Sequence, residues 1–412
     1  MSDRDPAVAA DVPSVGYETA AEETGRSPAV GESARRHILF AINSLAGGGA
    51  ERVFATLLAM PVPDAERFRV EAALLDGEPE AYRLPDHIPV HRLDCRHGLV
   101  RSVRRMTGLA KRQRVDLIVA FLTRTNVAAA FAARLSSRPF IVSERVDTSA
   151  HLATGRFAWI SRWLVRLTYR RAAAIIAVSK GVADTLVRDF GIDRSRISVI
   201  FNPVDTKRIE ARAAEPPAFP VRRDDCLAMG RLVPNKNFAL AIEAFARSGR
   251  SGRLVIIGEG PLRDALRALG DSHGLGERLV LPGFVENPYA ILARGGLFIL
   301  SSNAEGFPNA LVEALALGIP AVATDCKSGP AEILETRVRD AATGFAEGEG
   351  GLLVRPNDVA AMAAAIAQME DVALRLTLAA NGPERVAAFS PERAADRYWR
   401  VIETALADAR PG

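Results

Sequence analysis

Short apolar runs alternate with helix-like stretches along this chain, and the alternation starts afresh near its middle. In the first half the runs lie at 37–43, 69–75, 117–121, 140–143, 175–178 and 197–200. In the second half they lie at 226–230, 254–258, 279–282, 297–301 and 321–324. Neighbouring parallel strands need a long crossover, usually a helix, so this pattern predicts parallel sheets covered by helices. Because 412 residues exceed one average domain, we expect an α/β fold of two Rossmann-like, doubly wound domains.

Breaks in this pattern predict the domain limits. Residues 1–36 are rich in Ala, Glu, Ser, Gly and Pro and lack an apolar period, which predicts a disordered tail. A break rich in Ala, Glu and Pro within 205–222 predicts a linker that divides a first domain, 37–214, from a second, 215–390. The last segment, 391–412, begins with a proline and predicts a helix, because proline is tolerated in the first helical turn.

The cysteines and the apolar runs bear on the compartment. Cys95, Cys226 and Cys326 are widely separated, with no CxxC pair, which excludes a disulfide framework and a structural zinc and fits a reducing cytosol. The N-terminal segment lacks the apolar core of a signal peptide, and no run reaches about 18 apolar residues. We therefore expect a cytoplasmic protein without a membrane-spanning helix.

The net charge of +4 conceals a strong asymmetry between the two halves. Residues 1–36 carry 4 basic and 7 acidic side chains, residues 37–214 carry 28 and 17, and the remainder carry 21 and 25, giving −3, +11 and −4. A basic first half indicates an anionic partner, either phosphate groups or an anionic membrane surface. Few aromatic residues interleave with the basic ones and no nucleic-acid motif is present, so we expect no nucleic acid.

One basic stretch, 156–171, has the features of a helix lying in a membrane surface. Apolar residues at helical spacing (Phe157, Ile160, Leu164, Leu167), a row of arginines (Arg162, Arg166, Arg170) and two tryptophans (Trp159, Trp163) occur together in it. Such a helix suits the headgroup layer of an anionic bilayer, and a second basic stretch, 96–114, adds to the charge. The alternative is that the apolar stripe packs in the domain core.

Three glycine-containing turns follow predicted strands. Gly48 and Gly49 lie between the first strand and a helix, where backbone N–H groups can approach a phosphate. No GK[ST] follows, and Arg52 stands where a dinucleotide fingerprint needs its third glycine. Gly258 and the loop containing Val285 occupy similar positions in the second half, where backbone groups could contact a nucleotide. At each place a tight turn without a ligand is the alternative.

Charged residues of the second half suit a nucleoside diphosphate. Arg231 and Lys236 follow a predicted strand on a loop, and a guanidinium with an ammonium can hold the two phosphates, although two solvated surface charges are the alternative. Glu305 precedes a predicted helix whose free N–H groups would face an anion. Glu313, eight residues further on, would lie inside that helix, where its carboxylate could accept both hydroxyls of a ribose. The polar groups of the loop at 324–330 could contact a ligand at the same place, although we interpret this loop as structural.

Taken in order, several motifs resemble the family-four retaining glycosyltransferases, in the branch that makes bacterial surface glycans. They are GGAERV, VSKGV, GRL followed by KNF, GEGPLR, LPGF, EGFPN with its second glutamate, and TDC with GP. The match extends over roughly 37–400 and is densest over 229–332. The resemblance implies the GT-B fold, in which two Rossmann-like domains face each other across a cleft and the last helix packs back on the first domain.

The resemblance also implies roles for individual residues. Arg231 and Lys236 would bind the donor diphosphate, and Glu305 would hydrogen-bond the donor sugar. Donor binding would further involve Gly48, Gly49, Gly258, Val285, Gly306, Phe307, Asn309, Ala310 and Glu313. Many relatives have a histidine, or the sequence Ser-Glu-Arg-Asn-Asp, where this chain reads VSERVD, which would put Ser143, Glu144 and Arg145 on the acceptor side.

The implied reaction moves a hexose or N-acetylhexosamine from a nucleoside-diphosphate sugar to a glycan or polyprenyl-diphosphate-linked acceptor. It would serve exopolysaccharide, capsule or lipopolysaccharide assembly in the cytoplasm, with the protein peripheral on the inner face of the plasma membrane. Two cations beside the diphosphate would take the place of a metal, so we expect no metal and no cofactor. The alternatives are a nucleotide-sugar 2-epimerase and a non-catalytic nucleotide-sugar-binding subunit.

Overall fold

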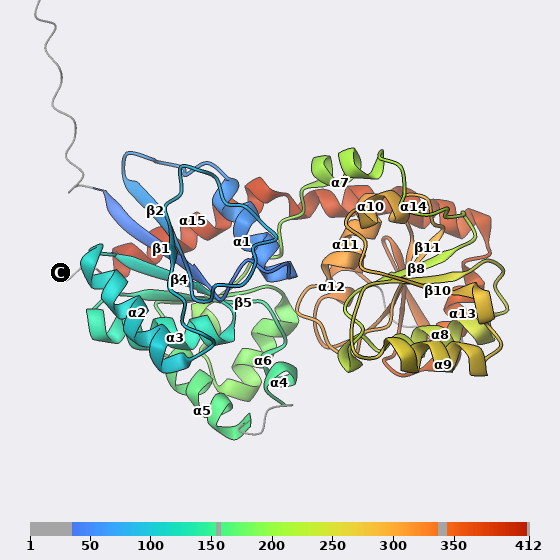
Figure 1. Cartoon of the computed structure of the whole chain (residues 1–412), viewed down its shortest axis with the longest axis horizontal. Helices are drawn as coiled ribbons and strands as arrows, with labels where there is room; N and C mark the ends of the chain where they lie inside the picture. Colours follow the sequence, from blue (N-terminus) through green and yellow to red (C-terminus); the bar gives the residue numbers. More distant parts are fainter. Residues whose placement is uncertain (1–34, 154–157, 337–343, 410–412) are drawn as a thin grey trace, which may run out of the picture. The chain divides into compact units, whose positions relative to one another are not determined.

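Two seven-stranded sheets form the frame of the protein, seen in a computed structural model that describes residues 35–153, 158–336 and 344–409 (Figure 1). The first sheet contains β1 (Arg36–Ile42), β2 (Phe68–Leu74), β3 (Val90–Arg92), β4 (Leu117–Phe121), β5 (Phe140–Glu144), β6 (Ala174–Ala177) and β7 (Ile197–Val199), in the order β3-β2-β1-β4-β5-β6-β7. All its strand pairs are parallel. From Arg36 onward the chain forms one compact unit.

The second sheet repeats this topology with one change at its edge. It contains β8 (Cys226–Met229), β9 (Leu254–Ile257), β10 (Leu279–Gly283), β11 (Leu297–Leu300), β12 (Ala321–Thr324), β13 (Phe345–Gly348) and β14 (Gly351–Val354). The order is β10-β9-β8-β11-β12-β14-β13, and only β13 runs antiparallel to its neighbour. The central strands are apolar throughout because both faces of each sheet are buried, as in β4, where all five residues are buried.

Helices cover both faces of the first sheet. On one face pack α2 (Leu99–Arg112), α3 (Thr123–Ser136), α5 (Ala158–Tyr169) and α6 (Lys180–Phe190). On the other face pack α1 (Gly49–Ala59) and α15 (Pro391–Asp408), the red helix that runs beside the blue strands in Figure 1. Alternate strand residues contact the two layers, so that Leu39 belongs to the first and Phe40 to the second.

The second sheet is covered in the same way. One face packs against α8 (Phe238–Ser248), α9 (Arg263–Ser272) and α13 (Val359–Gln368). The other packs against α10 (Pro288–Leu292), α11 (Asn309–Ala316) and α12 (Pro330–Leu334). Helix α7 (Thr206–Ala213) contacts α10 and α11, α14 (Val372–Val386) contacts α11, and α4 (Thr148–Ala153) contacts α5 and α6.

Helix α15 joins the end of the chain to its beginning. Ser390 caps its first turn by accepting a hydrogen bond from the N–H of Arg393. The Trp399 ring lies 5.0 Å from that of Phe68 in β2, and the Tyr398 ring stacks on Phe121 at the end of β4, with centroids 5.9 Å apart. The predicted doubly wound sheets and the final helix packed back on the first sheet are therefore confirmed.

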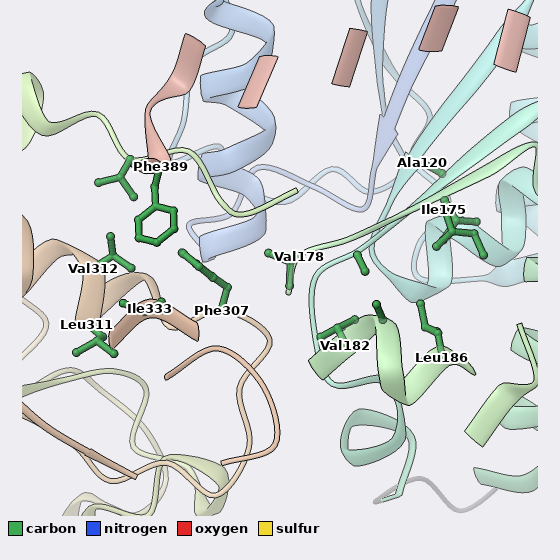
Figure 2. Close-up of a cluster of buried hydrophobic side chains, with 14 of the residues drawn as sticks. Ala120, Ile175, Val178, Val182, Leu186, Phe307, Leu311, Val312, Ile333 and Phe389 are labelled. Carbon is green, nitrogen blue, oxygen red and sulfur yellow. The ribbon is translucent and has the colours of Figure 1, made fainter. Parts of the chain in front are cut away.

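A cluster of buried side chains extends from the first sheet to the second (Figure 2). Phe201, which follows β7, and Phe307, which precedes α11, have ring centroids 5.5 Å apart. Phe389, just before α15, lies 5.3 Å from Phe201 and 5.4 Å from Phe307. This aromatic trio holds the loop before α11, in the second domain, against the segment that follows β7 of the first sheet.

Some element predictions were wrong. The first strand begins at Arg36, inside the predicted tail, whose residues 1–34 lie outside the described residues. Residues 206–213 of the predicted linker form α7, because Asp205 caps it by accepting from the N–H of Arg208 and its apolar side buries Ile209. Strands β3, β13 and β14 were not predicted, because β3 is short and largely polar and the hairpin interrupts the alternation with helices.

Candidate functional site

The predicted site residues follow the carboxyl ends of strands in both sheets. Lys236 follows β8, Gly258 follows β9 and Glu305 follows β11, while Gly48 follows β1 and Arg145 follows β5. In a parallel sheet these ends share one edge, which is where ligands of doubly wound domains bind. Contacts across the two sheets then bring the two sets together.

Lys236 and Glu305 form a direct ion pair. The Lys236 Nζ lies 2.6 Å from the Glu305 Oε1, and the Ser302 hydroxyl donates to the same oxygen at 2.6 Å. A short turn of 3-10 helix, Pro234–Lys236, holds the lysine, and the Asn235 side chain donates to the Ala304 carbonyl at 2.7 Å. The ammonium and the carboxylate thus lie side by side at the carboxyl edge of the second sheet. Their two loops, after β8 and after β11, are held together by these hydrogen bonds.

Arg231 lies on the same loop and is exposed. Its guanidinium makes no hydrogen bond or ion pair with another residue of the described chain, which leaves its donors for a ligand anion. Gly258 packs under this loop with φ of +142°, and a Cβ there would lie 2.0 Å from the Gly230 carbonyl oxygen. Gly258 therefore serves a close backbone approach between two neighbouring loops. Val285 is half-buried in the loop after β10 and packs against the core.

The start of α11 offers backbone donors beside the ion pair. Pro308 precedes the helix without a side-chain cap, and among the described residues no acceptor takes the N–H groups of Asn309 and Ala310. Such uncapped N–H groups and the positive end of the helix favour an anion. Phe307 is buried in the aromatic trio, so only its backbone is available at this point.

The first sheet's loops contact this region directly. Gly306 packs on the end of β5, since a Cβ on it would lie 2.3 Å from the Arg145 carbonyl oxygen. A Cβ on Gly49 would lie 2.6 Å from the Asn309 Nδ2. The predicted glycine turn and the predicted donor loop, far apart in sequence, are therefore neighbours, with Gly48 at the exposed N-cap of α1.

Ser143 and Glu144 lie inside the first domain. Ser143 exchanges a hydrogen bond with the Tyr398 hydroxyl at 2.8 Å, and Tyr169 donates to the Glu144 carboxylate. Burial raises the pKa of Glu144 to about 7, although the hydrogen bond from Tyr169 opposes this. Both side chains are fully buried, so in this arrangement they can act on a ligand only through their neighbours.

Arg145 is buried in a network that reaches α11. Its guanidinium contacts both the Phe121 and the Tyr398 ring, 5.1 and 5.5 Å from their centroids, and it donates to the Asn202 Oδ1 at 2.7 Å. Burial lowers the pKa of Arg145, while Tyr398 and Glu144 oppose that shift. Asn202 in turn donates from Nδ2 to the Asn309 Oδ1 at 2.7 Å.

The sequence interpretation missed Asn202 and noted Arg52 only as a misfit in a glycine motif. Arg52 lies on α1 and forms an ion pair with Glu313 of α11. The available signal for Asn202 is its place, because a polar residue directly after a predicted strand lies at the ligand-binding edge.

A second polar cluster, also unforeseen, lies where β2 ends. Asp76 is buried, pairs with Arg124, and accepts from the His97 backbone N–H at 2.9 Å. The His97 Nδ1 lies 3.2 Å from the Asp76 Oδ2, yet seven-tenths of its side chain is exposed. Asp94, Arg96 and His97 all have positive φ, between 43° and 55°, so this loop is strained in the way common at ligand sites.

Over 35–153, 158–336 and 344–409, no group of three or more His, Cys, Asp or Glu side chains is placed to hold a metal ion. Within those same ranges none of the helices is both long enough and apolar enough to cross a membrane. The three cysteines are free and buried.

Comparison with known families covers most of the chain. Residues 36–208 match the family described as Glycosyltransferase Family 4, and residues 223–371 match the glycosyl transferases group 1. The two matches correspond to the two sheets and exclude the first 35 residues.

Individual relatives agree with these families. The chain is 32% identical, over 84% of its length and 94% of the relative's, to N-acetylgalactosamine-N,N'-diacetylbacillosaminyl-diphospho-undecaprenol 4-alpha-N-acetylgalactosaminyltransferase of Campylobacter jejuni. It is also 32% identical to the lipopolysaccharide core biosynthesis glycosyltransferase LpsE of Rhizobium meliloti, over 58% of this chain and 66% of that one.

Among solved structures, Anabaena Alr3699/HepE in complex with UDP has the same fold. It superposes with a TM-score of 0.69 at 21% identity, over 89% of this chain and all of that one. The evidence for the family is the two doubly wound sheets, the final helix packed on the first of them, and the Campylobacter relative, which is 32% identical over 94% of its own length. The chain belongs to the family-four, group 1 glycosyltransferases and is a glycosyltransferase of the GT-B fold.

Proposed function

We propose that this glycosyltransferase moves a hexose or N-acetylhexosamine, with retention, from a nucleoside-diphosphate sugar to a glycan or lipid-linked glycan. The observation that carries this proposal is the Lys236–Glu305 ion pair, 2.6 Å across, beside the uncapped start of α11. It combines a cation and backbone donors for a diphosphate with a carboxylate for a sugar hydroxyl. The UDP complex of the Anabaena relative supports UDP as the first nucleotide to test.

In the proposed reaction the bond between the sugar C1 and the β-phosphate oxygen breaks as a bond from C1 to the acceptor oxygen forms on the same face. The acceptor proton passes to the departing diphosphate, so no carboxylate nucleophile is needed. Arg231, Lys236 and the N–H groups of Asn309 and Ala310 stabilise the negative charge that grows on the leaving group. Fixed charges and dipoles aimed at a developing charge are commonly the largest contribution to catalysis.

The acceptor would bind against the first sheet. The strained loop with exposed His97, held by buried Asp76, presents polar groups at the carboxyl edge, while the buried Ser143, Glu144 and Arg145 support that edge from within. The names of these relatives concern an undecaprenyl-diphosphate-linked glycan and the lipopolysaccharide core, which supports a surface-glycan acceptor. The same names make a 2-epimerase or a non-catalytic subunit less favoured.

The first domain would dock on the inner, anionic face of the plasma membrane from the cytoplasm. On α5 Trp159 and Trp163 are 72% and 57% exposed, one turn apart, with exposed Arg166 beside them, while Val165 and Tyr169 face the core. Helix α2 adds a hollow of about 580 Å³ lined by Arg92, Arg101, Arg104, Arg105 and Arg112. Exposed tryptophans with arginines suit the headgroup layer of a bilayer. Phe157, part of the predicted stripe, lies outside the described residues.

Two experiments test the proposal. Purified protein is incubated with UDP-, GDP- and ADP-linked sugars and polyprenyl-diphosphate-linked glycans. Mass spectrometry detects the products, and NMR assigns the anomeric configuration of the product and any epimerisation of the donor. A glycosylated acceptor with a retained anomer supports it, whereas an epimerised donor, or nucleotide binding without any turnover, contradicts it.

Sedimentation with anionic and neutral liposomes at low and high salt tests docking. Binding that is independent of lipid charge and of salt would argue against docking on an anionic membrane. The double variant Trp159→Ser/Trp163→Ser should bind anionic liposomes more weakly than wild type.

A further inference from the structure

Glu313 is a buried carboxylate on the face of α11 that meets the first domain. Only 4% of its side chain is exposed, and burial raises its pKa. An acidic side chain so placed becomes neutral unless a cation lies against it. The state of this carboxylate therefore depends on whatever α11 contacts.

Arg52 supplies the cation, and it comes from the other sheet. The Arg52 Nη2 donates to the Glu313 Oε1, while its Nη1 donates to the Tyr289 hydroxyl of α10 at 3.0 Å. Arg52 lies in the first turn of α1, which starts at Gly49, so its position is fixed by the same glycine turn that contacts Asn309. One guanidinium thus spans from α1 to two helices of the second domain.

The surrounding charges leave Arg52 as the group that holds Glu313 ionised. Burial lowers the pKa of Arg52, but Glu313, by its charge and its hydrogen bond, and the tyrosines Tyr289 and Tyr82 together raise that pKa above its ordinary value. Arg52 in turn lowers the pKa of Glu313. The other ionisable groups near the pair are Tyr82, Tyr289, Glu51 and Arg208. The two tyrosines act on Arg52 directly, whereas Glu51 and Arg208 act on the tyrosines. Neither tyrosine is a cation, and Arg208 influences the tyrosines instead of bonding to Glu313.

The second carboxylate oxygen is open. Arg52 engages Oε1, and no residue of the described ranges donates a hydrogen bond to Oε2. A carboxylate oriented by one oxygen and free at the other is prepared to accept a hydroxyl. A ribose of the donor nucleotide supplies such hydroxyls.

We infer that Arg52 is a positioning residue of the donor site, which keeps Glu313 ionised and oriented so that its free oxygen accepts a ribose hydroxyl. Nucleotide binding by the second domain therefore depends on contact with α1 of the first. This inference rests on the proposed function, since it assigns the ribose of a nucleoside diphosphate to Glu313.

Calorimetry of UDP binding tests it on the full chain. We compare wild type, Arg52→Gln, Arg52→Lys, Glu313→Gln and the double variant Arg52→Gln/Glu313→Gln, between about pH 6.5 and about pH 8.5. Because the diphosphate titrates near pH 6, each variant is read as its ratio to wild type at the same pH. Near pH 6.5 we expect Arg52→Gln to bind UDP roughly tenfold more weakly than wild type, the loss of one charge-assisted contact.

The pH and the double variant separate this role from simple packing. The deficit of Arg52→Gln should shrink toward pH 8.5 as Glu313 ionises, Arg52→Lys should show little pH dependence, and Arg52→Gln should add little once Glu313 is Gln. A deficit that is the same at every pH, or that persists undiminished in the Glu313→Gln background, would overturn the inference. Wild type that binds neither UDP, GDP nor ADP would instead contradict the proposed function.

Discussion

Asn202 donates a hydrogen bond of 2.7 Å to the side chain of Asn309, the first residue of α11, while accepting one from Arg145. Tyr398 of α15 contacts the same arginine. A buried chain of polar groups therefore links the C-terminal helix to the point where we propose the diphosphate binds.

The Asn202 link predicts a change in turnover. Asn202→Ala removes the hydrogen-bond donor to Asn309 and the acceptor for Arg145. We therefore expect kcat/KM to fall by roughly tenfold, which corresponds to about 1–2 kcal/mol for a buried hydrogen bond. Steady-state transfer measures it. Asn303→Ala is the matched control, since the Asn303 side chain is exposed and its one hydrogen bond among the described residues is accepted from Asn237. Equal rates in the two variants would contradict the assignment.

Arg231→Ala and Lys236→Ala should each lower transfer by roughly 10²–10³ while the fold stays intact, by analogy with the loss of one oxyanion donor. Each variant removes a charge that we propose faces the leaving group. Arg247→Ala, an exposed arginine on α8, is the control for lost positive charge. Transfer rates within about threefold of wild type in both site variants would exclude their proposed role.

The two glutamates should separate by what they bind. Glu313→Ala should weaken the binding of free UDP, because it removes the ribose acceptor, whereas Glu305→Ala should act on sugar transfer and leave UDP binding closer to wild type. Lys236, the partner of Glu305, remains in the second variant to hold phosphate. Calorimetry with UDP and transfer kinetics measure the two effects, and the reverse ranking would show that the roles are exchanged.

Gly306→Ala should impair the approach of the two domains. Its Cβ would lie 2.3 Å from the Arg145 carbonyl oxygen, a distance at which the backbone must shift. We expect kcat to fall at least tenfold, because the loop carrying Glu305 would move away from the first sheet. Gly77→Ala is the control, since a Cβ there meets nothing within 4 Å. Wild-type kcat in Gly306→Ala would show that this contact is dispensable.

Glu144 predicts a pH dependence of stability. Its pKa is about 7 in the folded chain against 4.5 as the ordinary value, so between these values the folded state holds a proton that the unfolded state releases. The free energy of unfolding should therefore fall as pH rises from about 4.5 to about 7, by up to about 3 kcal/mol from this group. Urea unfolding across that range measures it. Glu144→Gln should flatten the slope, and an unchanged slope would rule out Glu144 as its source.

Much of the fold was predictable because buried parallel strands read as continuous apolar runs. The strands at 117–121 and 321–324 were predicted to the residue, since both faces of each are covered. The edge elements failed for the opposite reason. In β13 only Ala346 is fully buried, so the strand has no continuous apolar run. Helix α7 has the composition of a loop, and the burial of Ile209 that stabilises it cannot be read from the sequence.

The site was predictable where a residue's place along a strand defined its role, and not where a role arises across the domains. Lys236 and Glu305 each follow a strand, and their pairing was consistent with that placement. Ser143 and Glu144 also lie at the carboxyl end of a strand, but their side chains are buried inside the first domain. There Ser143 hydrogen-bonds with Tyr398, and Glu144 accepts a hydrogen bond from Tyr169. The Arg52–Glu313 pair joins residues 261 positions apart, which no local spacing reveals.

Helix α15 has a consequence for biosynthesis. One face of the first sheet, with Phe68, Phe40 and Phe121 among its buried residues, is covered partly by Tyr398, Trp399 and Ile402. During translation this apolar surface is made before the helix that covers it, so the nascent first domain stays incomplete until α15 has left the ribosome. Exposed apolar surface on growing chains attracts chaperones and self-association. The first domain should therefore reach its native packing only after α15 has docked on it.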